Sequence, residues 1–167
     1  NGLLENVDMI SLVDDNVIIG RNLISRVLPK IKPSHIITDK RVSSLFQDQI
    51  DIGNVFCVDN INGNSLKEII SIVKNGGSPF LVGIGGGRVM DYLKYVMMET
   101  GKFCVAIPSS LATHVYASPK IHVLPAIAEL GNEKTIDGPV PDLAILDMGF
   151  LENLQRKNPR LLRAGLG

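Results

Sequence analysis

The sequence contains no tryptophan, only two cysteines and an aromatic content of 5%. Lysine and arginine together number 17, as do aspartate and glutamate, so the formal net charge is zero. A chain without a basic excess or a Lys/Arg-rich run lacks the electrostatic pattern of a nucleic-acid-binding protein. No apolar run approaches the roughly 18 residues that a membrane span needs. These absences argue against a nucleic-acid partner and against a membrane partner.

The two cysteines, Cys57 and Cys104, fall on strands that we expect to be buried. A free cysteine in such a position behaves as a small hydrophobic residue, so neither a disulfide nor a metal role is expected. We therefore predict a cytoplasmic protein with reduced thiols. The 167 residues, 45% of them hydrophobic, suit one domain with a sizeable core.

Apolar runs and helical patterns alternate along most of the chain. The pattern predicts a β-hairpin over Met9–Gly20, a helix over Leu23–Ile31, and a weak helix through Val42, Leu45 and Phe46. A later helix is expected to begin at Ser65 as N-cap, with Glu68 as its capping-box partner. Further strands are expected at His35–Thr38, Val55–Val58, Phe80–Val82, Phe103–Ile107 and Leu143–Leu146, and a second hairpin at Ile121–Leu124 and Lys134–Ile136. The fold class is therefore α/β, a Rossmann-like parallel sheet with helices on both faces and small β-hairpin insertions.

Three consecutive glycines, Gly85, Gly86 and Gly87, stand between a predicted strand and a predicted amphipathic helix. Glycine lets the backbone turn sharply and approach a ligand closely, and the first N–H groups of a helix have no partner within it. A phosphate is the natural occupant of such a turn. The pattern departs from G-x-G-x-x-G because its last position is Arg88. A tight turn without a ligand is the alternative.

Four ordered blocks cover about the second half of the chain, at Gly85–Lys94, Pro108–Pro119, Pro141–Asp147 and Pro159–Gly167. The first is similar to a Gly-Gly-Gly-Lys-x-x-Asp-x-x-Lys segment, and the second to a Pro-Thr-x-x-Ser-His-Asp-Gly-x-Ala-Ser-Pro segment. In these segments and in their order, the four blocks resemble the iron-containing alcohol dehydrogenase and dehydroquinate-synthase-like superfamily, nearest its glycerol-1-phosphate and glycerol dehydrogenase branch.

The resemblance implies a two-domain enzyme, with an N-terminal α/β domain that binds NAD or NADP. An all-helical C-terminal domain would supply most of the site for a divalent metal, zinc or iron. We expect residues 1–167 to form the NAD(P)-binding domain alone, with the helical domain and the metal ligands absent from this chain. The full-length protein is expected to be a homo-oligomer.

Several residues before and after the glycines have expected roles. The resemblance makes Gly85, Gly86 and Gly87 the pyrophosphate cradle and places an adenosine-ribose contact at Asp39. A turn-forming role is the alternative for Asp39, and the neighbouring Lys40 and Arg41 offer a 2′-phosphate contact, so NAD and NADP both stay open. Asp91 is expected either to hold the N–H groups of the loop or to contact the cofactor. Lys94 matches the family, with a solvated helix residue as the alternative.

The segment after the strand at Phe103–Ile107 carries the remaining candidates. Ser109, Ser110 and Thr113 offer hydroxyls where the family contacts nicotinamide and phosphates. His114 stands where the family usually has an aspartate that touches substrate, so we take it as the catalytic candidate. His35 and His122 have no partner at metal-ligand spacing and are expected to be structural.

The resulting function is the nucleotide-binding half of a metal-dependent NAD(P)-linked oxidoreductase. Its substrate would be glycerol, glycerol phosphate or a similar small polyol. Two alternatives stay open, namely a dehydroquinate-synthase-like cyclase domain and a non-catalytic dinucleotide-binding module.

Overall fold

The computed structural model describes residues 11–14, 16–33, 35–45, 55–111, 115–132 and 134–157. Seven strands of these residues form one sheet in the order β1-β2-β9-β6-β5-β3-β4. Their bounds are Ser11–Asp14 (β1), Val17–Gly20 (β2), His35–Thr38 (β3), Val55–Cys57 (β4), Phe80–Gly85 (β5), Phe103–Pro108 (β6) and Leu143–Asp147 (β9). Only β1 and β2 pair antiparallel, and every other pair of neighbours in this described sheet is parallel. The predicted first hairpin and parallel sheet are therefore confirmed.

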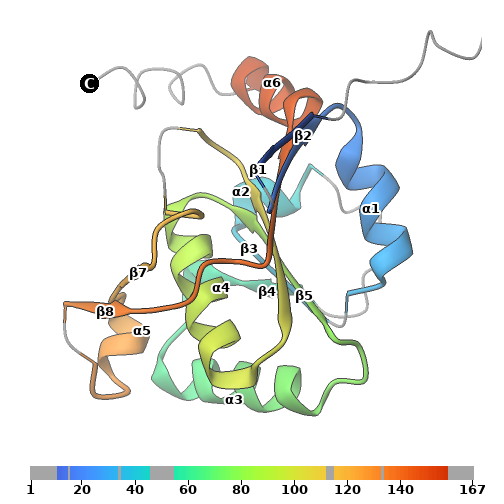
Figure 1. Cartoon of the computed structure of the whole chain (residues 1–167). Coiled ribbons are helices and arrows are strands. Elements are labelled where there is room, and N and C mark those ends of the chain that lie inside the picture. The colour runs from blue at the N-terminus through green and yellow to red at the C-terminus, as the bar shows by residue number, and fades with distance from the viewer. Residues whose placement is uncertain are drawn as a thin grey trace, which may run out of the picture.

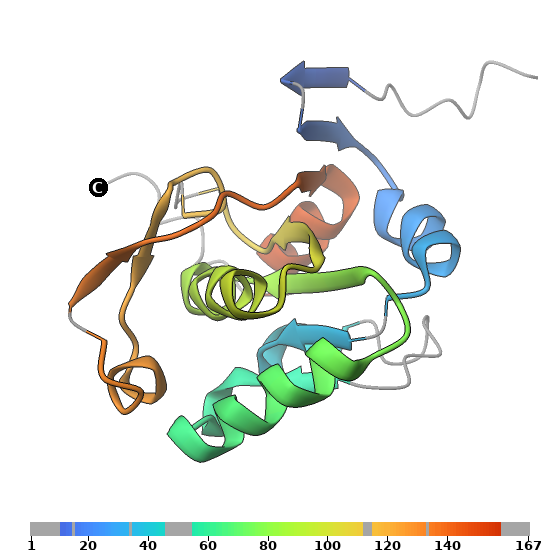
Figure 2. The ribbon, with the colours of Figure 1, turned by 60° about the horizontal axis from the view of Figure 1, so that its bottom comes forward.

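Helices cover both faces of the sheet, and Figure 1 shows α1 on one side of the strands and α4 on the other. Their bounds are Leu23–Ile31 (α1), Lys40–Ser43 (α2), Gly63–Asn75 (α3), Gly87–Thr100 (α4), Pro125–Ala128 (α5) and Met148–Lys157 (α6), with a 3₁₀ turn at Val58–Asn60. The strands β7 (Lys120–His122) and β8 (Thr135–Asp137) form the second predicted hairpin. This hairpin and α5 lie beside α3 and α4, away from α1 (Figures 1 and 2).

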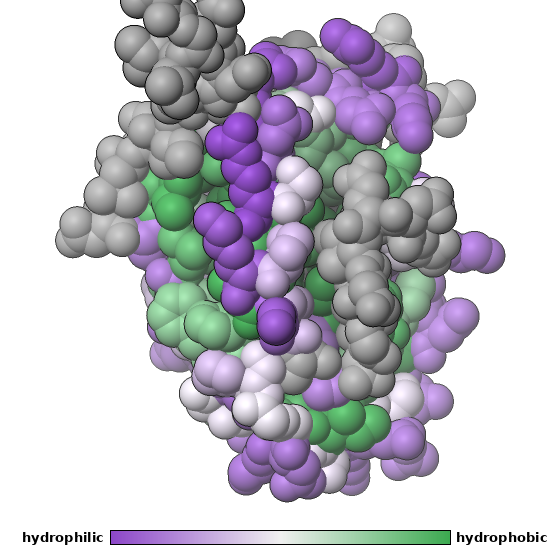
Figure 3. Space-filling view, turned by 90° about the vertical axis from the view of Figure 1, so that its right-hand side faces the viewer, coloured by the Kyte–Doolittle hydropathy of each residue, from purple (hydrophilic) through white to green (hydrophobic). Residues whose placement is uncertain are grey.

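Each face of the sheet has its own apolar core. One core joins the sheet to α3, α4 and α5, with Leu66, Leu93 and Ile127 fully buried. The other joins it to α1 and includes Leu28 and Ile145. Hydrophilic side chains run down the outside of the molecule on the α1 side (Figure 3). Burial on both faces explains why β3, β5 and β6 have near-continuous apolar sequences.

Two expectations about local structure are wrong. Cys57 is exposed, because β4 is the last described strand at its edge of the sheet. The N-cap of α3 is Asn62, whose side chain accepts the Ser65 N–H at 2.9 Å, while the Ser65 hydroxyl accepts the Asn62 N–H. Ser65 is therefore the third helical residue of a capping box that begins earlier. Helix α6 was not predicted from the sequence, and Phe46 lies outside the described residues.

His35 occupies the start of β3 and is 2% exposed. Its ring stacks on Phe56 with centroids 5.2 Å apart, and neither ring nitrogen has a hydrogen-bond partner among the described residues. Burial, together with the charge of Lys102, lowers the pKa of His35 below its ordinary value of 6.5. The expected structural role of His35 agrees with this environment.

We predict that the free energy of unfolding falls as the pH drops below about 6.5. The unfolded chain then binds a proton at His35 before the folded chain does, which favours unfolding. Urea denaturation at pH 7.5 and 5.5 measures this difference, and His35→Leu should reduce it. An equal loss of stability in both proteins would contradict the assignment.

Candidate functional site

The neighbouring strands β3 and β5 mark the point in the sheet where the strand order reverses. From β3 the chain passes through α2 to β4 on one side, and from β5 it passes through α4 to β6 on the other. Loops that leave in opposite directions open a crevice at the carboxyl ends of the two strands. Ligands of open α/β sheets bind in such a crevice.

A pocket of about 400 Å³ lies at this edge of the sheet. Its volume falls in the range of about 300–1,000 Å³ that is typical of small-molecule sites. The lining comes from the ends of β3, β5 and β6, from α2 and from α6. The residues are Asp39, Arg41, Val42, Ser44, Leu45, Gly86, Ser109, Ser110, Leu154 and Lys157. Four of the predicted cofactor residues are therefore brought together in one pocket.

The glycines after β5 meet different surroundings. A Cβ on Gly83 would lie 2.7 Å from Leu93, and one on Gly85 would lie 2.8 Å from the Cβ of Val89, so α4 leaves no room for either. Among the described residues, a Cβ on Gly86 would have the Ser109 Oγ as its nearest neighbour at 3.8 Å, and one on Gly87 would have Val115 at 3.7 Å. The packing of α4 therefore requires Gly85, whereas the described neighbours of Gly86 and Gly87 leave room for a Cβ, and Gly86 lines the pocket.

Gly86 is also the N-cap of α4 and has no side chain to accept the first N–H groups of the helix. These groups and the helix dipole favour an anion at this end of α4. The turn is tied to β6, since the Ser109 N–H donates to the Gly85 carbonyl at 2.9 Å.

Asp39 follows β3 and faces the glycine turn. One carboxylate oxygen accepts the Val42 N–H at 2.9 Å and caps α2. The other lies 3.2 Å from the place where a Cβ of Gly85 would stand. The structure thus confirms a turn-forming role for Asp39 and also places its second oxygen at the edge of the glycine turn.

Asp91 and Lys94 lie on α4 and point away from the pocket. Asp91 is 4% exposed and accepts the His122 N–H at 3.0 Å, so the hydrogen bond is with β7 rather than with the glycine turn. Burial raises the pKa of Asp91, although the hydrogen bond from the His122 amide opposes this. A cofactor contact by Asp91 stays a prediction. Lys94 is 0% exposed, so the alternative of a solvated helix residue is wrong.

Two predicted residues, Thr113 and His114, lie outside the described residues, and their roles stay predictions. The contribution of α6, which supplies Leu154 and Lys157 to the pocket, was not predicted from the sequence. The signal was present, because Leu151 and Leu154 are three positions apart and both are buried.

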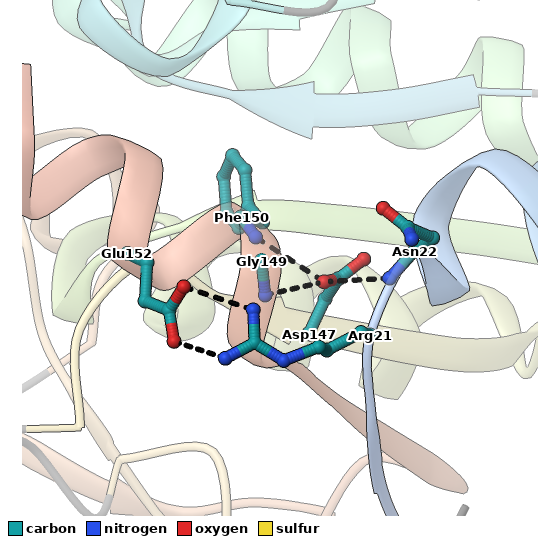
Figure 4. A network of polar contacts seen from close by, with 6 residues as sticks. All are labelled: Arg21, Asn22, Asp147, Gly149, Phe150 and Glu152. Carbon is teal, nitrogen blue, oxygen red and sulfur yellow. Dashed lines mark hydrogen bonds and ion pairs between the residues drawn. The ribbon is translucent and has the colours of Figure 1, made fainter. Parts of the chain in front are cut away.

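Asp147, at the carboxyl end of β9, holds α6 and α1 in place (Figure 4). It is 3% exposed, and its carboxylate accepts four backbone N–H groups. The donors are Asn22 at 3.2 Å, Ile24 at 3.0 Å, Gly149 at 3.0 Å and Phe150 at 3.2 Å. The exposed Arg21 and Glu152 form an ion pair beside it, between the start of α1 and α6.

Among the described residues, no three His, Cys, Asp or Glu side chains gather closely enough to hold a metal ion. No helix in that part of the chain has both the length and the apolar character to cross a membrane.

Comparison with known proteins identifies the family. Residues 30–153 match the family described as iron-containing alcohol dehydrogenase. The chain belongs to this family.

Curated relatives in the family carry a more specific name. A glycerol-1-phosphate dehydrogenase [NAD(P)+] of Methanococcus aeolicus is 30% identical over 152 residues, which are 89% of this chain and 40% of that protein. A second, of Sulfurisphaera tokodaii, is 27% identical over 132 residues, 79% of this chain and 35% of that protein. The chain therefore spans less than half the length of these two relatives.

Two solved structures have a similar fold. Glycerol dehydrogenase from Schizosaccharomyces pombe superposes with a TM-score of 0.64 at 16% identity, over 82% of this chain and 37% of that one. Sulfoacetaldehyde reductase from Bifidobacterium kashiwanohense, solved in complex with NAD+, superposes with a TM-score of 0.62 at 17% identity. The match covers 86% of this chain and 47% of that one. The predicted Rossmann-like α/β fold is confirmed by these similarities.

We predict that Asp147→Ala destabilises the protein by about 3 kcal/mol, because it leaves buried N–H donors without an acceptor. The matched control is Glu152→Ala in the same network, which removes an exposed ion pair and should change stability little. Urea denaturation of both variants measures the difference. Equal stability of the two variants would contradict the role of Asp147 as the shared acceptor.

Proposed function

We propose that this chain is the NAD(P)-binding domain of a metal-dependent oxidoreductase that acts on glycerol, glycerol phosphate or a similar small polyol. The observation that carries the proposal is the pocket that Gly86 lines at the start of α4. Among the described residues, the packing at Gly86 leaves room for a Cβ, and the pocket lies at the point where the sheet reverses its strand order. The names of the glycerol-1-phosphate dehydrogenase relatives support the substrate class.

The pocket residues suggest how the dinucleotide binds. The N–H groups of the first turn of α4 would hold the pyrophosphate beside Gly86 and Gly87. The second carboxylate oxygen of Asp39 would accept from the ribose hydroxyls, and the apolar side chains of Leu45 and Leu154 would contact the adenine. Ser109 and Ser110 would donate to the phosphates or the nicotinamide half.

The choice between NAD and NADP depends on two neighbours of opposite charge. Asp39 favours a ribose with free hydroxyls, whereas Arg41 in the same pocket offers a guanidinium to a 2′-phosphate. Both coenzymes are therefore part of the proposal.

When bound, the nicotinamide would accept or deliver a hydride, which is chemistry that the cofactor itself supplies. The described residues would bind and orient it, and His114 is proposed to contact the substrate. A zinc or iron ion is proposed for the full-length enzyme with ligands outside this chain. The described residues offer no ligand set for that ion, so the roles proposed for this chain concern the dinucleotide and the substrate. We also infer a cytoplasmic homo-oligomer for the full-length protein.

We predict that Gly86→Val weakens binding of NADH and NADPH at least about tenfold. The backbone at Gly86 is extended (φ −86°, ψ −165°) and accepts a β-branched residue, so the variant should fold. The new side chain would stand where the pyrophosphate must approach. The matched control is Gly77→Val, a glycine for which no atom of the described residues lies within 4 Å of the added Cβ. Calorimetry that finds unchanged affinity in Gly86→Val would refute the assignment of the pocket.

We predict that the 167 residues alone show no metal-dependent dehydrogenase activity. Hydride transfer from an alcohol needs the developing alkoxide stabilised, and a metal site needs several ligands fixed in geometry. The measurement is the change in nicotinamide absorbance with glycerol, glycerol phosphate or dihydroxyacetone phosphate, with zinc or iron supplied. Chelator-sensitive turnover by this chain would overturn the prediction and would point to metal ligands within it.

A further inference from the structure

Lys94 is fully buried, yet none of its hydrogen bonds to the described residues is to a carboxylate. Its ammonium group donates to three backbone carbonyls, those of Val115 at 2.9 Å, Ser118 at 3.1 Å and Lys120. A lysine ammonium has three donors, so all are used. Burial of a charge is expensive unless its hydrogen bonds are complete. An apolar side chain would fill the same space without the free-energy cost of burying a charge. We therefore attribute the presence of a lysine at this position to its hydrogen bonds with the three carbonyls.

The three carbonyls belong to one short segment, Val115–Lys120, that returns from the pocket toward β7. The same helix also holds β7, into which this segment leads, because Asp91 accepts the N–H of His122. Burial lowers the pKa of Lys94, and the negative charge of Asp91 opposes that effect. Two charged residues one turn apart on α4 therefore hold the returning segment and the strand that it enters.

The held segment touches the glycine turn. The Cγ2 atom of Val115 lies 3.7 Å from the place where a Cβ of Gly87 would stand. Asp39 approaches the same turn at Gly85. The two contacts fall at the two ends of the glycine triplet, so a dinucleotide with its adenosine at Asp39 would extend over the turn toward Val115.

We propose that Lys94 is a positioning residue that holds Val115–Lys120 against the glycine turn and thereby shapes the nicotinamide side of the cofactor site. The proposal rests on the proposed function, since it takes the pocket to be that of a dinucleotide. Lys94 does not contact the cofactor. It acts through the carbonyls that it gathers, and its loss should affect the nicotinamide half of the cofactor and leave the adenosine half unaffected.

The test compares two ligands by calorimetry on the whole chain: NADH, which spans both halves of the site, and ADP, which occupies only the adenosine and diphosphate half. Lys94→Met keeps the length of the side chain and removes the three donors. We expect NADH affinity to fall about tenfold and ADP affinity to change less than about twofold. The matched control is Lys102→Met, because Lys102 likewise donates to two carbonyls, those of Gly76 at 2.8 Å and Ser78 at 2.9 Å, at the other end of α4. It should leave both affinities unchanged.

Each possible result of this comparison either supports or overturns the proposal. Equal losses for NADH and ADP in Lys94→Met, or no loss for either, would overturn it and leave Lys94 with a structural role only. A wild-type chain that binds neither ligand would refute the proposed function itself, and that failure is visible before any variant is made. Lys94→Gln, which keeps two donors, gives the same comparison if Lys94→Met does not fold. A smaller NADH-selective loss in that variant supports the proposal, and a loss shared with ADP overturns it.

Discussion

The close packing of helix α4 on strand β5 is the constraint on which the rest of the site depends. Leu93 and Val89 occupy the positions where Gly83 and Gly85 would otherwise carry a Cβ. This packing makes the helix begin immediately after the strand, so its first N–H groups open at the carboxyl edge of the sheet. The same edge receives Asp39 from β3 and Ser109 from β6. The position of α4 therefore places the N–H groups of its first turn, and the positive end of its dipole, at the pocket.

The same helix carries two buried charges on its second and third turns. Burial disfavours the charged form of both Asp91 and Lys94, raising the pKa of one and lowering that of the other. Each is compensated by backbone groups of the segment that leads to β7 and by the charge of the other. Buried charges of this kind contribute little net stability and are best understood as fixing one arrangement of the backbone. Helix α4 thus links the anion site to the segment that borders it.

Most of the fold could be predicted from local pattern, and the parts that could not be predicted depend on distant contacts. The strands β3, β5 and β6 and the helices α1, α3 and α4 follow from apolar periodicity, glycines and caps, which act over a few residues. The burial of Lys94 could not be predicted, because its three partners lie 21 to 26 residues further along the chain. The role of Asp147 depends on donors more than 120 residues away. The exposure of Cys57 depends on strand order, which local pattern does not specify.

The glycine triplet meets two separate physical requirements, the packing of α4 at Gly85 and the proposed approach of a ligand at Gly86. A sequence motif does not distinguish the two. Gly85 is needed whether or not a ligand binds, because α4 could not pack with any side chain there. Its presence therefore argues for the fold and carries no information about a ligand. Gly86 has an extended backbone and lines the pocket, and its described neighbours leave room for a Cβ, so neither strain nor the described packing requires glycine at that position. A ligand in the pocket would supply such a requirement, and the first N–H groups of α4, which have no partner within the helix, make an anion the natural occupant.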